Sequence, residues 1–312
     1  MSAALPPYEA PWWLPGGHLQ TLGPVLWPKA RVAWARERWE TPDGDFIDLD
    51  WAGREANRAG PLLVLFHGLE GSSSSHYARS IAAEALARGW RCVVPHFRGC
   101  SGSLNRLPRA YHSGDSEEID WILRRLEPAA AAGISLGGNV LLKWLGETGA
   151  KAPLRKAAAV SAPFDLAAVG RTLDRGVNRR LYTRAFLLTL KAKAIAKVAL
   201  NQLALDSRTL ARIRTLHEFD DMVTAPLHGF RDADDYWARA ASGPWLGSIA
   251  VPVLLVNARN DPFMPASVLD ALQSRRDIPA HVTLEFPETG GHAAFPCRER
   301  WLARRVLDFL AA

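Results

Sequence analysis

The segment Gly133-Ile134-Ser135-Leu136-Gly137-Gly138 constrains the fold more than any other part of the chain. A short apolar stretch precedes it and an amphipathic run follows it, which predicts a strand, a sharp turn at Ser135 and a helix. A serine on such a turn needs small neighbours, because its backbone is strained and the helix must pack close to the strand. An isolated match of this kind is more typical of a glycine-rich helix start with a capping serine, so the pattern needs support from the rest of the chain.

Apolar runs and helical periods alternate along the chain. The run from Leu62 to Phe66 ends abruptly, as a strand buried on both faces should, and further strands are expected at 91–95, 253–257 and 282–286. Ahead of them, two alternating stretches flank the turn at 41–45 and predict a hairpin. The alternation predicts an α/β fold with a mostly parallel central sheet flanked by helices, and ligand-contacting loops at the carboxyl ends of the strands.

The clearest helical signal follows Ser113, the expected N-cap of a helix with acidic residues in its first turn. Its apolar face is formed by Ile119, Ile122, Leu123 and Leu126. A second amphipathic pattern, from Leu302 to Leu310, predicts a C-terminal helix.

Between Phe164 and about Trp245 the strand signals stop, and the chain becomes helical and basic. We expect one α/β domain over residues 1–312, with residues 165–245 inserted as a helical cap over the carboxyl edge of the sheet. Within the cap, the segment from Arg179 to Leu200 is basic and amphipathic. Such a helix can lie on an anionic membrane, which would give a peripheral membrane contact through the cap. It can also form a lid whose apolar face packs on the sheet, the commoner behaviour of a surface helix.

Composition excludes several classes of protein. The net charge of +6 is mild and the basic residues are scattered, so nucleic acid is not expected as a partner. Cys92, Cys100 and Cys297 form no metal-binding or paired spacing, which favours a reducing, cytoplasmic setting without a bound metal. The N-terminus lacks the pattern of a signal peptide, and no apolar run approaches the roughly 20 residues of a spanning helix.

A serine hydroxyl becomes an effective nucleophile only when a base takes its proton and an acid orients that base. In the α/β-hydrolase fold the acid follows a late strand and the histidine follows the last one. Asp261 and His292 occupy these two positions, after the runs at 253–256 and 282–286. Asp165 is a rival acid, although the residues after it look equally like a helix behind its cap. We therefore predict a triad of Ser135, Asp261 and His292.

Two backbone amides are needed to hold the oxyanion of a tetrahedral intermediate. Leu136, the residue after the nucleophile, is expected to supply one, and Leu69 in the glycine-containing loop after the first buried strand the other. His67 in this loop is expected to be structural, bonding loop carbonyls. Cys100 lies in what is most simply a tight turn, and it lacks the context of a nucleophile.

Taken together, these motifs make the chain resemble the YheT-type α/β-hydrolases, bacterial proteins described as esterases whose animal relatives include membrane-associated phospholipases. The resemblance covers nearly the whole chain and rests on PWWLPGGHLQT, HGLEGSSSSHYARS, HFRGCSG, NRLPRAYHSGD, GISLGGN, NDPFMP and GGH. It implies that Ser135, Asp261 and His292 are the catalytic residues. It also implies carboxylic ester hydrolysis without a cofactor, on a small-molecule or lipid ester, which we expect to carry a short- to medium-chain acyl group.

Two other functions remain open at this point. An acyltransferase or a thioesterase would use the same triad with a different acceptor or leaving group. A non-catalytic scaffold that binds a lipid or a hydrophobic partner has no need of serine, acid and histidine in this order, so the sequence argues against it.

Overall fold

The computed structural model describes residues 5–55, 58–200 and 202–312. Within them, eight strands form one sheet in the order β1-β2-β4-β3-β5-β6-β7-β8. β2 pairs antiparallel with β1 and β4, and all other neighbours are parallel. The strands are β1 (Ala35–Glu40), β2 (Phe46–Ala52), β3 (Leu62–Phe66), β4 (Arg91–Pro95), β5 (Ala130–Ile134), β6 (Lys156–Val160), β7 (Val253–Val256) and β8 (Val282–Glu285).

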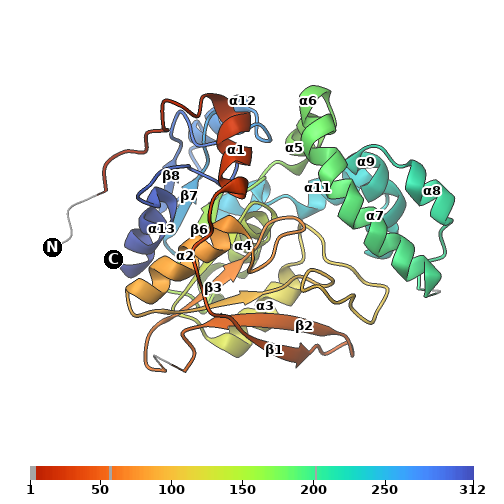
Figure 1. The fold of residues 1–312 in the computed structure, drawn as a ribbon, viewed down its shortest axis with the longest axis horizontal. Coiled ribbons are helices and arrows are strands. Elements are labelled where there is room, and N and C mark those ends of the chain that lie inside the picture. The colour runs from red at the N-terminus through yellow and green to blue at the C-terminus, as the bar shows by residue number, and fades with distance from the viewer. Residues whose placement is uncertain (1–4, 56–57, 201) are drawn as a thin grey trace.

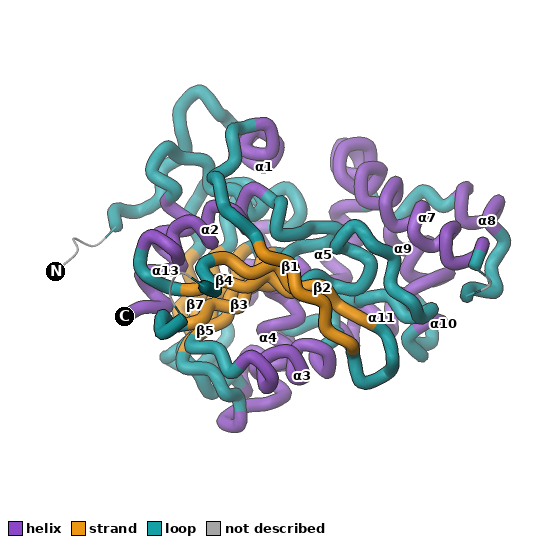
Figure 2. Tube along the Cα trace, turned by 60° about the horizontal axis from the view of Figure 1, so that its bottom comes forward, coloured by secondary structure: helices purple, strands orange, loops and turns teal. Residues whose placement is uncertain are grey.

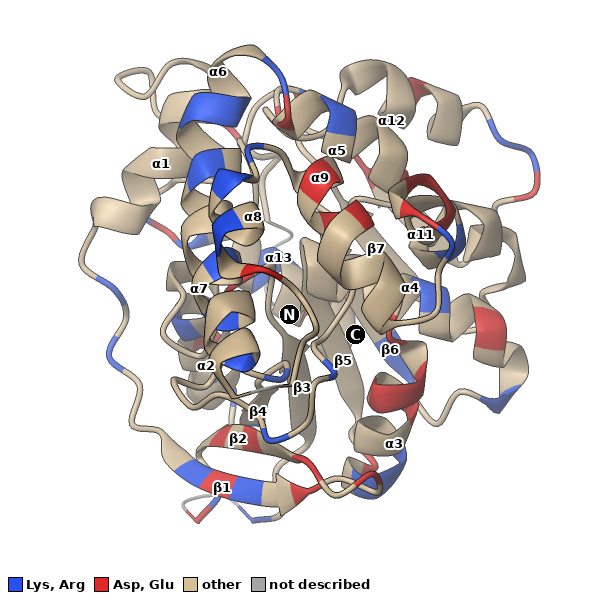
Figure 3. Cartoon of the chain, turned by 90° about the vertical axis from the view of Figure 1, so that its right-hand side faces the viewer, with Lys and Arg blue, Asp and Glu red and all other residues tan. Residues whose placement is uncertain are grey.

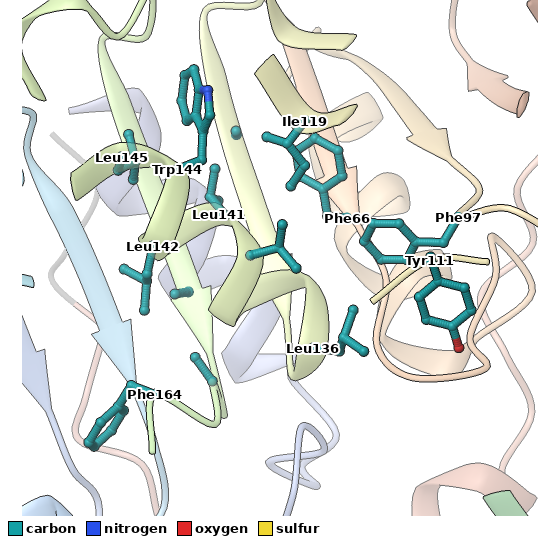
Figure 4. Packing of buried hydrophobic residues seen from close by; sticks show 14 of the residues in the cluster. Phe66, Phe97, Tyr111, Ile119, Leu136, Leu141, Leu142, Trp144, Leu145 and Phe164 are labelled. Carbon is teal, nitrogen blue, oxygen red and sulfur yellow. The ribbon is translucent and has the colours of Figure 1, made fainter. Parts of the chain in front are cut away.

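Helices cover both faces of this sheet, as the alternating pattern predicts (Figure 2). Those outside the segment between β6 and β7 are α1 (Gly16–Leu26), α2 (His76–Ala87), α3 (Ser116–Leu126), α4 (Leu136–Thr148), α12 (Ala266–Gln273) and α13 (Trp301–Ala311). The side chains of β3 alternate between two cores: Val64 and Phe66 join the cluster under α3 and α4, while Leu63 and Leu65 join the cluster under α2 and α13. Figure 4 shows the first cluster, in which α4 packs its leucines and Trp144 close to the sheet.

One expected helix start is wrong. Ser113 was expected as the N-cap of α3, but the N-cap is Asp115 and the helix starts at Ser116. The amide of Ser113 donates to Tyr236 Oη at 2.8 Å and its carbonyl accepts from Asn139 Nδ2 at 2.6 Å. Ser113 therefore stays in a loop, because its backbone groups are bonded to distant residues instead of to a helix.

The described residues between β6 and β7 form helices and connecting loops without a strand, and these helices lie to the right of the sheet in Figure 1. They are α5 (Leu166–Leu173), α6 (Gly176–Asn178), η2 (Arg179–Thr183), α7 (Arg184–Ala199), α8 (Ser207–Arg212), α9 (Leu216–Phe219), η3 (Asp220–Thr224), α10 (Ala225–Leu227), α11 (Ala233–Ala240) and η4 (Gly243–Ser248). Among the helices described, none has the length and apolar character needed to cross a membrane.

The long helix α7 packs inward with apolar and with charged side chains. Phe186 and Leu190 line a cavity beneath it, as a lid would require. Lys193 and Lys197 line the same cavity: Lys193 Nζ lies 2.5 Å from Glu70 Oε1, and Lys197 Nζ donates to the carbonyl of Leu107. Some charged side chains of this helix therefore face the protein. Neither a membrane-binding helix nor a lid with an apolar inner face, the two expectations for this segment, included such inward charges.

Candidate active site

Ser135 occupies the turn between β5 and α4. Its backbone has φ 51° and ψ −121°, a conformation that costs a residue with a side chain about 1–3 kcal/mol. Its amide donates to the carbonyl of Val160 on the neighbouring strand at 2.8 Å. Gly137 permits the close packing behind the turn, because a Cβ there would lie 2.5 Å from the carbonyl oxygen of Phe66. The sharp turn expected from the glycine-bracketed serine is therefore present.

Asp261 and His292 meet Ser135 at the carboxyl edge of the sheet. His292 Nε2 lies 2.8 Å from Ser135 Oγ, and His292 Nδ1 lies 2.8 Å from Asp261 Oδ2. Because a carboxylate only accepts hydrogen bonds, Nδ1 donates, and Nε2 keeps a lone pair for the serine proton. The structure thus joins the three side chains of the predicted triad in one hydrogen-bonded row.

The acid and the base are held in orientation by the same neighbour. Asp261 has a fully buried side chain, and its Oδ1 accepts from the amide of Phe263 at 2.8 Å. The ring of Phe263 stacks on the imidazole of His292 with centroids 4.0 Å apart. This one residue therefore fixes the carboxylate through its backbone and the imidazole through its ring.

Leu69 and Leu136, the predicted oxyanion donors, both line the cavity that contains Ser135 and His292. Leu136 is the first residue of α4, where the N–H groups find no carbonyl within the helix and the helix dipole is positive. Its amide is suited to donate a hydrogen bond to a negatively charged oxygen that forms next to Ser135.

The loop that carries Leu69 is held by two tyrosine hydroxyls. The amide of Gly68 donates to Tyr77 Oη at 2.9 Å, and the amide of Glu70 donates to Tyr111 Oη at 3.0 Å. The amide of Leu69 between them has no hydrogen-bond acceptor within the described part of the chain. Gly68 and Glu70 are held in place while the amide of Leu69 remains able to donate. This amide is therefore suited to be the second donor to the oxyanion.

His67 supports this loop from behind. Its Nε2 accepts from the amide of Phe97 at 3.1 Å, so its Nδ1 carries the proton and donates to the carbonyl of Gly68 at 2.8 Å. Complete burial lowers the pKa of His67 to about 3, which keeps the ring neutral. The residue fills the structural role expected of it.

Asp165, the rival acid, and Cys100, the other candidate nucleophile, do not take part in this hydrogen-bonded row. Asp165 is exposed and caps α5, accepting from the amide of Ala168 at 2.9 Å. Cys100 lies in a tight turn in which its amide donates to the carbonyl of Phe97. Burial raises the pKa of the Cys100 thiol to about 12, so the thiol stays protonated and unreactive.

Helix α1 binds the loops of the acid and the base, which sequence reasoning missed. Gln20 Oε1 accepts from Asn260 Nδ2 at 2.9 Å and from the amide of Gly290 at 2.8 Å. Thr21 Oγ1 accepts from the amide of His292 at 2.9 Å. Two side chains of one helix therefore connect the loops after β7 and β8.

The approach of α1 to the acid loop is very close. A Cβ at Gly17 would lie 1.9 Å from the carbonyl oxygen of Asn260, so only glycine fits there. The signal that could have revealed this contact is the pair Gln20 and Thr21, two buried polar side chains in an otherwise apolar segment. The motif PWWLPGGHLQT thus carries, besides the family resemblance, the residues that hold the loops after β7 and β8.

A second serine also holds the histidine loop. Ser161, directly after β6, has φ 49°, and its Oγ accepts from the amide of Ala293 at 2.9 Å. Ala293 follows His292 and itself has φ 57°. The position of His292 is therefore set on one side by α1 and on the other by the turn after β6.

The cavity beside Ser135 measures about 140 Å³ and lies between the sheet edge and the helices that follow β6. Its apolar lining includes Leu166, Val169, Leu173, Phe186, Leu190, Phe219, Val223, Trp237, Phe263 and Met264. Asp220 is an acid in this lining, and its burial raises the pKa of the carboxyl to about 6. Within the described ranges, no group of three or more His, Cys, Asp or Glu side chains is arranged to hold a metal ion.

The chain is similar to proteins of one known family. Residues 61–296 match the family model of the alpha/beta hydrolase fold. The chain is 42% identical to "Putative esterase YheT" of Escherichia coli K12, over 94% of this chain and 89% of that protein. It is 28% identical to human "Phospholipase ABHD3", over 98% of this chain and 78% of that protein.

Solved structures share the fold at low sequence identity. A serine hydrolase from Cycloclasticus zankles has a TM-score of 0.59 at 18% identity, over 88% of this chain and 96% of that chain. An esterase from Exiguobacterium antarcticum has a TM-score of 0.57 at 16% identity, over 88% of this chain and 99% of that chain. At such identities the likeness supports the fold alone.

Proposed function

The chain belongs to the α/β-hydrolase family as a homologue of YheT, and from that premise we propose that it is a serine hydrolase that cleaves carboxylic esters through an acyl-enzyme. The observation that carries the proposal is the row of hydrogen bonds from Ser135 Oγ through the imidazole of His292 to Asp261, with both bonds at 2.8 Å. Its esterase and phospholipase homologues support hydrolase activity.

The geometry supports a two-step reaction. His292 Nε2 takes the proton of Ser135 Oγ, which attacks the ester carbonyl, while the amides of Leu69 and Leu136 hold the oxyanion. The intermediate collapses, the C–O bond to the alcohol breaks, and the alcohol leaves with the proton from His292. A water molecule activated by the same imidazole then releases the carboxylic acid and restores Ser135. Asp261 orients the imidazole and stabilises its charged form.

The cavity indicates the kind of acyl group. Its walls are mostly apolar, and they include Leu173 and Phe186 from the segment 165–245, which we propose acts as a cap over the site. A short- to medium-chain acyl group of a small ester or of a lipid fits such a lining. The name of the human relative, a phospholipase, agrees with a lipid ester.

The test is hydrolysis of p-nitrophenyl esters of graded acyl chain length by the wild type and by Ser135→Ala. We expect release of p-nitrophenolate by the wild type with an optimum at one chain length, and none above background by the variant. A fluorophosphonate probe should add its mass to the peptide that contains Ser135 and not to the peptide that contains Ser161, which lines the same cavity.

Two results would contradict the proposal: equal ester hydrolysis by both proteins, or labelling of a serine other than Ser135. Labelling of Ser135 without ester hydrolysis would replace the esterase with a thioesterase or an acyltransferase, to be tried on acyl thioesters and on added alcohols. The absence of both labelling and hydrolysis would leave a scaffold that binds a hydrophobic ligand.

A further inference from the structure

Helix α1 shows its apolar side to solvent and its polar side to the protein. The residues it buries are Gln20, Thr21 and Pro24. The large side chains it exposes are Leu19, Leu22, Val25 and Leu26. A helix on the surface of a soluble protein normally has the reverse arrangement, so the outer face of α1 needs an explanation of its own.

Exposed apolar side chains of the described residues gather in two places. Six of the eleven large ones lie in the segment 12–26, including Trp12 at 91% exposure and Leu26 at 86%. Three more lie in the segment 177–188: Val177, Leu181 and Leu188. Two remain elsewhere, Leu200 and Trp245. We call the nine residues in the two segments the apolar patch.

The two parts of the apolar patch adjoin. His18 Nδ1 on α1 lies 3.1 Å from Tyr182 Oη in η2, and the two rings stack with centroids 5.8 Å apart. α1 and α6 stand on the same side of the molecule in Figure 1. Tyr182 also packs on Phe263, whose ring lies against His292. The patch is therefore two side chains away from the proposed catalytic base.

The charge next to the patch has one sign. Residues 175–205 contain seven Lys or Arg residues and no Asp or Glu, and residues 11–28 contain none of these four types. Four exposed arginines have no carboxylate partner in the described part of the chain: Arg175, Arg179, Arg180 and Arg184. They line one surface hollow, and its only acid, Asp174, accepts from the amides of Leu216 and His217. Figure 3 shows the resulting basic colouring along α7.

We propose that α1 together with the segment 175–188 is a docking surface for a lipid bilayer that contains anionic lipids. Leucine and tryptophan side chains enter the boundary between headgroups and acyl chains, and the arginines bind the phosphates above it. A second copy of this chain fits less well, because neither segment offers a carboxylate to pair with the arginines of the other copy. The inference goes beyond the proposed function and does not depend on it. If that function holds, docking places ester lipids on the side of the molecule where Tyr182 and Phe263 connect the patch to His292.

The test is co-sedimentation of the full chain with vesicles of equimolar phosphatidylglycerol and phosphatidylcholine, against vesicles of phosphatidylcholine alone. It is run with the wild type and with Ser135→Ala, so that a failure of the catalytic proposal does not affect the readout. Leu188→Ser is compared with Leu200→Ser, because both leucines lie at the surface of α7 or at its end, with exposures of 65% and 59%. Arg179→Gln with Arg180→Gln is compared with Arg155→Gln and Arg276→Gln, exposed arginines outside the patch.

We expect binding to the anionic vesicles at least tenfold tighter than to the neutral ones. Leu188→Ser should weaken it about tenfold and Leu200→Ser not at all, since only the first leucine enters the bilayer. The Arg179 and Arg180 pair should weaken it roughly 30-fold, a factor of about five for each arginine, and more than the control pair. Thermal unfolding should be unchanged in all four.

Three outcomes would overturn the proposal. The wild type could fail to bind anionic vesicles, or the patch and control variants could bind equally. The wild type could also elute as a dimer that Leu188→Ser converts to a monomer without any vesicle binding, in which case the patch covers a second copy of the chain.

Discussion

The turns after β5 and β6 place a serine at neighbouring, equivalent positions of the sheet. Ile134 and Val160 are paired in register, so Ser135 and Ser161 are the next residues of two parallel strands. Their φ angles are 51° and 49°. Each amide donates to the last residue of the following strand, Val160 for Ser135 and Val256 for Ser161. The two serines thus share a positive φ and the same kind of amide acceptor, so their different roles must come from what surrounds the hydroxyls.

The surroundings differ in two ways. After Ser135 the helix α4 begins at once, so the amide of Leu136 has no carbonyl partner within that helix, whereas Ser161 is followed by Ala162-Pro163 and no helix begins until Leu166. The Ser135 hydroxyl faces an imidazole, whereas the Ser161 hydroxyl accepts from the amide of the residue after that imidazole. A serine with a positive φ at the sheet edge is therefore suited to act as a nucleophile only where a base and an anion site adjoin it. Without them it anchors a loop.

The largest predicted effect separates these two serines by activity. Ser135→Ala should lower kcat about 10⁶-fold, because the nucleophile is removed. Ser161→Ala should lower kcat about tenfold with little change in KM, because the Ala293 amide loses its acceptor and His292 becomes less well positioned. Steady-state kinetics on the best p-nitrophenyl ester measure both. A loss of similar size in the two variants would mean that both hydroxyls take part in the chemistry, and the comparison would fail.

Asp261→Asn should have the next largest effect, about 10⁴-fold in kcat with KM nearly unchanged. An amide at this position no longer holds the proton on Nδ1 of His292, so Nε2 loses the lone pair that Ser135 needs. Asp165→Asn is the matched control, and it should keep full activity because Asp165 only caps α5. Equal losses in the two variants would return Asp165 to consideration as the acid.

The fold and the turn at Ser135 could be predicted from the sequence better than the role of Ser161. That Ser135, Asp261 and His292 lie together at strand ends could be predicted because glycines and strand ends mark them locally. β5 itself, Ala130–Ile134, has weak strand propensity and was inferred from the motif that follows it. Ser161 carries no such mark, since its role depends on a hydrogen bond to a residue 132 positions away.

Long-range contacts explain the other differences from expectation. Gln20 acts on the loop of His292 across 270 positions of sequence, through a bond to Gly290 whose partner the polar residues of α1 do not identify. Ser113 looks like an N-cap locally, but its amide is bonded to Tyr236, and the N-cap lies two residues later, at Asp115. Local propensity sets the type of these elements, and distant partners decide where they end and what they hold.

A smaller effect concerns stability at the loop that Ser161 anchors. His76 is mostly buried and interacts with the backbone of Ala293, and burial lowers its pKa from 6.5 to about 4. The unfolded chain binds this proton first as pH falls, so the stabilising contribution is fully present above pH 6.5 and is lost as pH falls toward 4. His76→Gln should reduce the slope of the unfolding free energy by up to about 1.4 kcal/mol per pH unit in this range.

Urea unfolding at a series of pH values measures that slope. His67, with a pKa also lowered by burial, remains in the variant and contributes equally to both curves, so the readout is the difference between wild type and variant. Parallel curves would show that His76 takes up its proton as easily in the folded protein as in the unfolded chain.

The smallest predicted effect tests the feature that the two serines share. At Ser161, glycine and alanine both remove the hydroxyl, but only glycine adopts φ 49° without strain, so Ser161→Gly should be about 1 kcal/mol more stable than Ser161→Ala. The same pair at Ser135 should differ by at least as much, because ψ −121° there lies outside the left-handed helical region as well. Urea midpoints of the four variants give both differences. If glycine were more stable than alanine at position 135 alone, only the turn after β5 would store strain. The turn after β6 would then share the positive φ without its energetic cost.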